Sequence, residues 1–190
     1  MRILLVILIL VFNSETFSKA DDIRDFQIEG MSIGDSLLNY FSVDEINRGL
    51  RDYYKNKKFT DTELTSVNFK IYDTVHVNFK TNDKAFKIHS LGATIIFKEN
   101  INECYKKKDE IVDELSKILT NAEKKIYGKR KHPADKSGLS TTDSVWFYFN
   151  SGDRIFVSCF DWSNKTIYTD HLRVTIRNDE FNQFINDEYN

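Results

Sequence analysis

The feature that most constrains the fold is a short apolar run that leads into a long amphipathic helix, between residues 93 and 122. Residues 93–97 (ATIIF) are typical of a buried strand, and Asn100 can cap the helix that follows. Beyond it, apolar residues recur at three- and four-residue spacing, which predicts a single apolar stripe. The stripe comprises Ile101, Cys104, Tyr105, Ile111, Val112, Leu115, Ile118, Leu119 and Ala122. Such a helix is expected to cover one face of a sheet.

Alternating apolar and polar residues flank this helix on both sides and predict strands joined by tight turns, which favours antiparallel pairing. The strands are expected at 67–72, 75–79 and 93–97 before the helix, with residues 86–91 leading into the last of these, and at 145–149, 155–160 and 172–176 after it. Shorter helices are expected at 32–41, 42–49 and 179–185, a connector at 50–58 and a mobile loop at 124–144. The predicted fold is α+β: an antiparallel sheet with helices packed on one face, in the order helix, strands, helix, strands.

Length and composition describe a folded protein of modest size. The chain has 190 residues, of which 41% are hydrophobic and 29% charged, as in ordinary globular domains. This length suits one domain with a real core. The formal net charge of −2 gives no overall attraction to nucleic acid, so we expect no nucleic-acid partner.

The first twenty residues have the layout of a secretory signal peptide. Met1 and Arg2 supply a positive start, residues 3–12 form an unbroken apolar run, and the cleavage site is expected between Ala20 and Asp21. The alternative is an uncleaved anchor, but the run is about half of the roughly 20 residues that a bilayer needs. We therefore expect residues 1–20 to be removed and residues 21–190 to form a single α+β domain. The expected location is periplasmic or secreted, with no membrane span in the mature chain.

Export changes how the two cysteines are interpreted. Cys104 lies on the apolar stripe of the long helix, and Cys159 follows Ile155 and Val157 on one side of a predicted strand. If that strand lies under the helix, both thiols point into the same layer, and an oxidising compartment would favour a disulfide between them. The alternative is that both remain free thiols packed as small apolar groups.

One short motif resembles an enzyme signature. Residues 34–37 (GDSL) match the nucleophile block of the GDSL esterases and lipases, in which the serine attacks an ester carbonyl. The resemblance would make Ser36 the nucleophile, and it implies partner blocks that activate it. Asp73 and His76 have the expected Asp-x-x-His spacing but lie in mid-chain, and residues 81–83 (TND) lack the glycine of the oxyanion block. A serine without a positioned base is a weak nucleophile, and the alternative is that Ser32–Asp35 begins a helix.

A wider resemblance covers most of the mature chain. Residues 25–38 (DFQIEGMSIGDSLL), 103–106 (ECYK) and 158–162 (SCFDW) are similar to segments of an uncharacterised family of small exported proteins of marine alphaproteobacteria. The resemblance implies a bacterial, periplasmic setting. It implies no activity, because none is known for that family.

Two clusters are candidate binding surfaces. The first is basic, comprises Lys129, Arg130 and Lys131 with neighbouring lysines, and is suited to an envelope protein or an anionic envelope component. The alternative is a solvated loop. The second is aromatic and includes Trp146, Tyr148 and Trp162, on a predicted hairpin whose two faces are both apolar. Aromatic side chains serve apolar ligands and partner surfaces, but they equally build a thick core.

The sequence contains no pattern that specifies a reaction. The four histidines (His76, His89, His132 and His171) lack metal-ligand spacing, so we expect no metal site, no cofactor and no catalytic residue. The best functional hypothesis is a periplasmic, non-enzymatic binding or interaction module of unknown role. The alternatives are an envelope hydrolase that uses Ser36 and a purely structural envelope protein.

Overall fold

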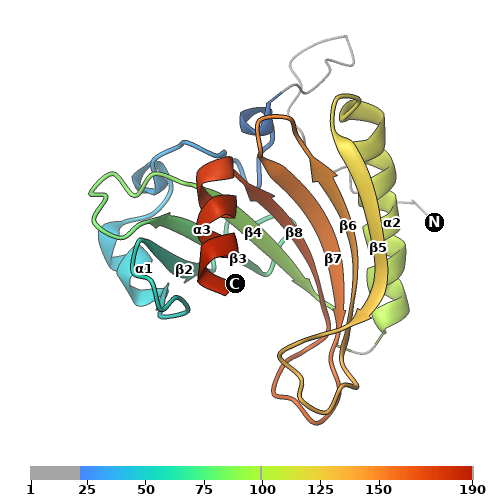
Figure 1. Cartoon of the computed structure of the whole chain (residues 1–190). Helices are drawn as coiled ribbons and strands as arrows, with labels where there is room; N and C mark the ends of the chain where they lie inside the picture. Colours follow the sequence, from blue (N-terminus) through green and yellow to red (C-terminus); the bar gives the residue numbers. More distant parts are fainter. Residues whose placement is uncertain (1–21, 99, 190) are drawn as a thin grey trace, which may run out of the picture.

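The computed structural model describes residues 22–98 and 100–189, so the signal peptide and the Ala20–Asp21 cleavage site predicted above lie outside the described residues. Its main element is one antiparallel sheet of eight strands in the order β1-β2-β3-β4-β8-β7-β6-β5 (Figure 1). The strands are β1 (Leu50–Arg51), β2 (Phe59–Leu64), β3 (Thr74–Lys80), β4 (Ser90–Ile96), β5 (Glu123–Lys131), β6 (Thr141–Tyr148), β7 (Arg154–Asp161) and β8 (His171–Arg177). The fold is therefore mixed α+β.

The helices divide the chain into two halves that are built alike. The three α-helices are α1 (Val43–Arg48), α2 (Ile101–Ile118) and α3 (Asp179–Tyr189), and the 3-10 helices are η1 (Ile23–Asp25) and η2 (Leu37–Asn39). Four consecutive strands follow α1 and four follow α2, and the two sets join where β4 pairs with β8. Each set is a meander in which consecutive strands are neighbours. The first set runs from one edge of the sheet (β1) to its centre (β4), and the second runs from the other edge (β5) to the centre (β8).

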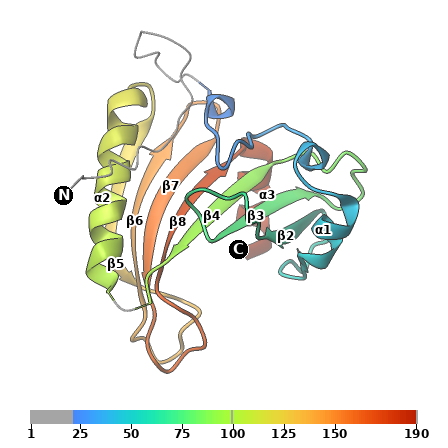
Figure 2. The ribbon, with the colours of Figure 1, turned by 180° about the vertical axis from the view of Figure 1, so that it is seen from behind.

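One face of the sheet, which we call the first face, carries the main core. Side chains alternate between faces along a strand, and Val157 and Cys159 of β7 with Leu172 and Val174 of β8 point to the first face. There they pack in one cluster with the buried stripe of α2 and with the N-terminal segment from Ile23 to Phe41. Seen from behind, this layer lies in front of the strands (Figure 2).

The expectation that the helices share one face is not confirmed. Helix α3 lies across the opposite face, which we call the second face, as the two views of the ribbon show. Phe181 and Phe184 of α3 pack there against Phe59 of β2 in a small separate cluster. The sequence shows only that α3 has an apolar face, and such a face can cover either side of a sheet.

Residues 32–41 do not form the expected helix. Only η2 is helical, because the surrounding backbone pairs with another segment: Gly34 N donates to Ile88 O and Leu37 N donates to Phe86 O. These long-range hydrogen bonds replace those of a helix and place the segment beside residues 86–88.

The strand expected at 67–72 was also misplaced. The strand in this part of the chain is β2, which begins at Phe59, directly after the connector predicted at 50–58. Val67 is fully exposed, and the amides of Lys70 and Tyr72 donate to the Glu29 carboxylate rather than to a neighbouring strand. The alternating apolar and polar residues at 67–71 therefore belong to a turn, which the Glu29 carboxylate holds in place.

The prediction of a mobile loop at 124–144 is wrong for most of that segment. Strand β5 runs through it and pairs with β6 as the edge strand of the sheet. Its polar composition is that of an edge strand, where lysines discourage pairing with other chains. The positive φ of Gly128, at the register shift between Ile126 and Gly128, marks a bulge that glycine accommodates without strain.

Candidate binding groove

The second face of the sheet holds a groove that α3 leaves uncovered. Its volume is about 600 Å³, and it is lined by residues of β2, β3, β4, β8 and the end of β7, together with Tyr53, Tyr54, His132, Ala134, Trp162, Tyr168 and, from α3, Tyr189. Its lining includes most of the polar side chains on this face of the central strands. We call it the second-face groove. Its size falls within the usual range for sites that bind small molecules.

A carboxylate with its partners lies on one side of the groove. Asp61 on β2 is almost fully buried; its Oδ1 lies 3.1 Å from His76 Nδ1, and its Oδ2 accepts from Asn78 Nδ2 at 2.9 Å. The same Asn78 amide donates to the Tyr54 hydroxyl at 3.1 Å. Burial raises the pKa of Tyr54, so its hydroxyl keeps its proton. Asp61 is thus held in a network of neutral donors and a histidine.

An aromatic wall forms the other side. The Phe160 ring stacks on His171 with centroids 4.5 Å apart, and the Trp162 ring lies 4.4 Å from both His132 and Tyr168. Strands β7 and β8 place Phe160 opposite His171, while the other rings come from the segments beyond the strand ends. Flat rings gathered in this way offer apolar contact area with few rotatable bonds.

Two arginines of the central strand β8 lie between these sides. Arg173 stacks over the Phe160 ring at 5.5 Å, and Arg177 lies over the Phe156 ring at 4.8 Å and the Phe181 ring at 5.5 Å. Within the described residues, no carboxylate lies within 4.0 Å of either guanidinium, although twelve other ion pairs are present. Burial lowers the pKa of Arg177 to about 10, which still leaves it protonated at neutral pH.

The groove concentrates buried polar atoms that have no hydrogen-bond partner among the described residues. Most buried polar groups in proteins do have a partner. Here all the buried side-chain atoms without one belong to residues on or beside the second face: Thr94 Oγ1, Thr142 Oγ1, Trp162 Nε1, His171 Nε2, Arg173 Nε, Thr175 Oγ1, Arg177 Nε and Asn182 Oδ1. Five of these eight residues line the groove: Trp162, His171, Arg173, Thr175 and Arg177. An external partner could satisfy them.

His171 is held in its neutral form. Burial lowers its pKa to about 4, the positive charge of Arg173 acts in the same direction, and the Thr169 carbonyl near Nδ1 opposes both. The hydrogen bond to that carbonyl requires a proton on Nδ1, so Nε2 of the neutral ring is an acceptor that faces the groove.

This shift predicts a loss of stability in mild acid. Because the folded-state pKa lies below the ordinary histidine value of about 6.5, the unfolded chain binds the proton first, and stability falls as the pH drops from about 6.5 toward 4. Between pH 7.5 and 5 the wild type should lose about 2 kcal/mol more than His171→Phe, which keeps a ring on Phe160. Urea unfolding at the two pH values measures the difference, and equal losses would contradict the assignment.

The residues predicted as an aromatic binding surface lie on the second face but do not form one site. Trp162 lines the groove. Trp146 and Tyr148 lie on β6, toward the edge of the sheet, where Trp146 stacks on Phe156 with centroids 4.2 Å apart. The Tyr148 ring is contacted by Arg154 at 5.3 Å, and neither Trp146 nor Tyr148 lines the groove.

The side chains of the predicted basic cluster do not all point to the same face of β5, the strand that carries them. Lys129 pairs with Asp161 at 2.9 Å, and Asp161 also accepts from the Tyr105 hydroxyl of α2, so Lys129 belongs to the first face. Arg130 lies over the Tyr127 ring at 4.6 Å, and Lys131 lies beside Gly138. The three side chains therefore do not form one basic surface.

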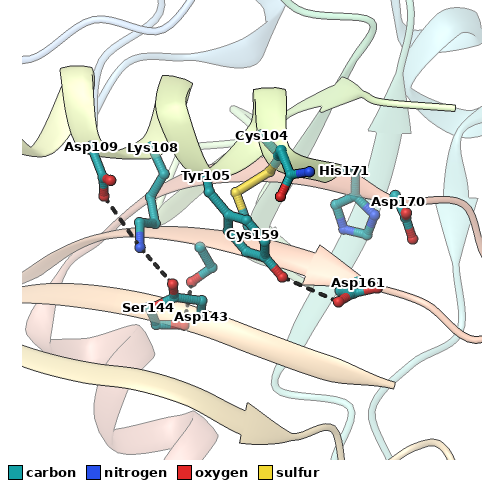
Figure 3. The surroundings of a disulfide bond; sticks show 12 residues. Cys104, Tyr105, Lys108, Asp109, Asp143, Ser144, Cys159, Asp161, Asp170 and His171 are labelled. Atoms are coloured by element: carbon teal, nitrogen blue, oxygen red, sulfur yellow. Dashed lines mark hydrogen bonds and ion pairs between the residues drawn. A yellow bond between two sulfur atoms is a disulfide. The ribbon is translucent and has the colours of Figure 1, made fainter. Parts of the chain in front are cut away.

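The disulfide between Cys104 and Cys159 is present, as the sequence predicted, and ties α2 to β7 (Figure 3). Both cysteines are fully buried in the main core. Beside the bridge, the buried Lys108 of α2 donates to Asp143 of β6 at 2.8 Å. This pair adds a second link between the helix and the sheet, on the first face and away from the groove.

Ser36, the hydrolase candidate, is engaged as a capping residue. Its hydroxyl donates to the Ala85 carbonyl at 2.6 Å and accepts from the Leu38 amide at the start of η2. The Asp-x-x-His residues do not pair with each other either, since His76 hydrogen-bonds Asp61 and Asp73 accepts from the Ile96 amide. The sequence reasoning missed Arg173 and Arg177. Their alternation with Leu172, Val174 and Ile176 was visible, but nothing in it showed that their face would be partly covered.

Two observations complete the description of the site. Among residues 22–98 and 100–189, no group of three or more His, Cys, Asp or Glu side chains is arranged to hold a metal ion. No helix of the described chain is long and apolar enough to cross a membrane.

Comparison with known proteins gives no match: no family model, no curated protein and no solved structure is similar to the chain.

Proposed function

We propose that the protein is an exported, non-enzymatic binding module that takes its ligand in the second-face groove. The observation that carries this proposal is the set of buried polar atoms without partners that converge on one groove. Leaving such atoms unpaired costs free energy, and a bound ligand would recover it. The module would act in the periplasm or outside the cell, as the predicted signal peptide implies.

One feature supports binding rather than catalysis, and a second supports export. The second-face groove contains a histidine–carboxylate pair, His76 and Asp61, but no hydroxyl or thiol of the described residues hydrogen-bonds His76. An activated nucleophile needs such a base within hydrogen-bond reach. The Cys104–Cys159 bridge is consistent with export, because disulfides persist mainly in oxidising compartments.

The two tryptophans of the chain allow a direct test. In Trp146→Phe, the remaining Trp162 reports on the groove; in Trp162→Phe, the remaining Trp146 reports on the neighbouring aromatic stack. We expect an extract of the source cells to change the Trp162 emission in a saturable way, with a much smaller change for Trp146.

The extract is titrated both whole and after ultrafiltration. Activity in the filtrate identifies a small ligand, whereas activity only in the retained fraction identifies a macromolecular partner; both outcomes support a binding module. The absence of any saturable change, or equal changes in the two variants, would contradict the proposal and favour the purely structural alternative.

A further inference from the structure

The chemistry of the second-face groove indicates which class of ligand it takes; this inference rests on the proposed function. The starting point is Arg173, which lies on the central strand β8 with its Nε buried and without a hydrogen-bond partner. Burial lowers the pKa of Arg173, with Asp61 the main opposing group. A guanidinium nevertheless stays protonated at neutral pH, so the groove holds a permanent positive charge.

The acidic groups nearest to this charge are already engaged. Asp61 accepts hydrogen bonds from Asn78 and is paired with His76, and Glu63 pairs with Arg51 at 3.0 Å. None of the ion pairs among the described residues includes Arg173. A partly buried charge without a counterion is costly, and an anion from outside the chain would compensate it.

The atoms that neighbour Arg173 indicate the shape of the anion. Trp162 Nε1 is a second buried donor without a described partner, and it belongs to the aromatic wall. The Phe160 ring of the same wall lies under the Arg173 guanidinium. A ligand that reaches Arg173 with an oxyanion therefore brings the rest of its body against flat aromatic surface.

The floor of the groove leaves room beside Arg173. Gly92 of β4 lies there, and a Cβ added to it would meet Thr175 Oγ1 at 3.5 Å and both Arg173 Cδ and His76 Cβ at 3.8 Å. These are ordinary van der Waals contacts, so an alanine fits without forcing the backbone to move. The glycine thus keeps open a space that Arg173, Thr175 and His76 border.

Arg177 does not share this role. Its guanidinium lies over the rings of Phe156 and Phe181, so it joins α3 to the sheet. Its Nε is also buried without a partner, but Arg173 is the guanidinium that borders both the space at Gly92 and the aromatic wall. Because Asp61 and Glu63 also line the groove, a singly charged group is favoured over a doubly charged one.

We propose that the second-face groove binds a small aromatic or similarly flat carboxylate, whose carboxylate pairs with Arg173 and whose ring lies against the aromatic wall. Arginine presents a planar fork of donors that matches the two oxygens of a carboxylate. The unpartnered Arg173 Nε and Trp162 Nε1 would then both find an acceptor.

Isothermal titration calorimetry with matched probes tests this proposal. The probes are 3-phenylpropionate, its neutral analogue 3-phenylpropanamide, and phenyl phosphate. We expect the carboxylate to bind about tenfold or more tightly than the amide, since a charge-assisted hydrogen bond contributes that much, and more tightly than the phosphate. Arg173→Gln should remove the advantage of the carboxylate, and Gly92→Ala should weaken both the carboxylate and the amide by narrowing the space beside Arg173.

Arg154→Gln is the matched control, because Arg154 also stacks on a ring of the second face, that of Tyr148, but does not line the groove. It should leave the affinity for 3-phenylpropionate within about twofold of the wild type. Circular dichroism and thermal unfolding establish that each variant is folded. If Arg173→Gln is not folded, Arg173→Lys is used in its place, because it retains the charge.

The outcomes separate this inference from the proposed function. Equal binding of carboxylate and amide, tighter binding of phenyl phosphate, or no effect of Arg173→Gln would overturn the carboxylate assignment while leaving the groove a binding site. If no probe binds and the Trp162 emission responds to no extract fraction, the proposed function fails as well.

Discussion

Removing the disulfide should destabilise the protein more than any single surface change. The Cys104–Cys159 bridge closes a segment with a sequence separation of 55 residues. For a loop of that length the chain-entropy relation gives about 4 kcal/mol at 25 °C. We expect Cys104→Ala/Cys159→Ala to lose about 4 kcal/mol of unfolding free energy or slightly more, because both sites are fully buried and alanine also leaves a small void.

Guanidinium unfolding of the oxidised wild type and the double variant measures this loss. Reduction of the wild type should produce a similar change, which controls for the substitutions themselves. Lys106→Ala, at an exposed position of the same helix, should change stability by less than about 0.5 kcal/mol. A loss below about 1 kcal/mol in the double variant would show that α2 is held on the first face without the bridge.

Phe181→Ala should be the most damaging substitution on the second face. Phe181 has no exposed surface, and its ring makes an edge contact with Phe59 at 5.1 Å and lies near Arg177. It belongs to the small cluster that joins α3 to β2. Truncating a buried phenylalanine costs about 3 to 5 kcal/mol, and we expect a loss near the lower end because the cluster lies close to the surface.

Chemical denaturation measures this loss, with Asp187→Ala, at an exposed position of α3, as the control. Hydrogen exchange of the α3 amides should accelerate selectively in Phe181→Ala, since local opening no longer costs the aromatic contacts. A loss below about 1 kcal/mol would mean that α3 is not anchored by this cluster and that the groove lacks a fixed boundary on that side.

The sequence predicted the parts of the fold that depend on periodicity. The stripe of α2 and the alternation of β7 and β8 are local patterns, and they predicted the Cys104–Cys159 bridge on the condition that β7 lies under α2, as it does. The mixed α+β class followed from the same patterns. Periodicity was reliable here because α2 and β8 each have one apolar side and one polar side.

Where neighbours outside the local segment decide the structure, the sequence predictions were wrong. The polar strand β5 was expected to be a loop, because an edge strand with lysines on it lacks the apolar alternation of a buried strand. Residues 32–41 match a helix start, but hydrogen bonds to residues 86–88 take its place. Neither partner is visible from the segment itself.

The candidate site depended on long-range packing still more. Trp162 was identified by its aromatic character, but Arg173 was not distinguished from any polar residue on the wet side of a strand. Its importance follows from three facts of packing: α3 lies on the second face, the nearest acids are engaged elsewhere, and the Arg173 Nε is buried without a partner. A sequence pattern contains none of these.

Mapping by nuclear magnetic resonance is the sharpest test of whether the second-face groove is the recognition surface of the protein. A library of small organic fragments is added to the ¹⁵N-labelled protein, and shifts of the backbone amides and the two tryptophan indole N–H signals are recorded. We expect hits to perturb the Trp162 indole and the amides of β8, carboxylates to be over-represented among these hits, and the Trp146 indole to respond less. Hits scattered over the first face, or confined to other surfaces while the Trp162 indole stays unchanged, would contradict this expectation.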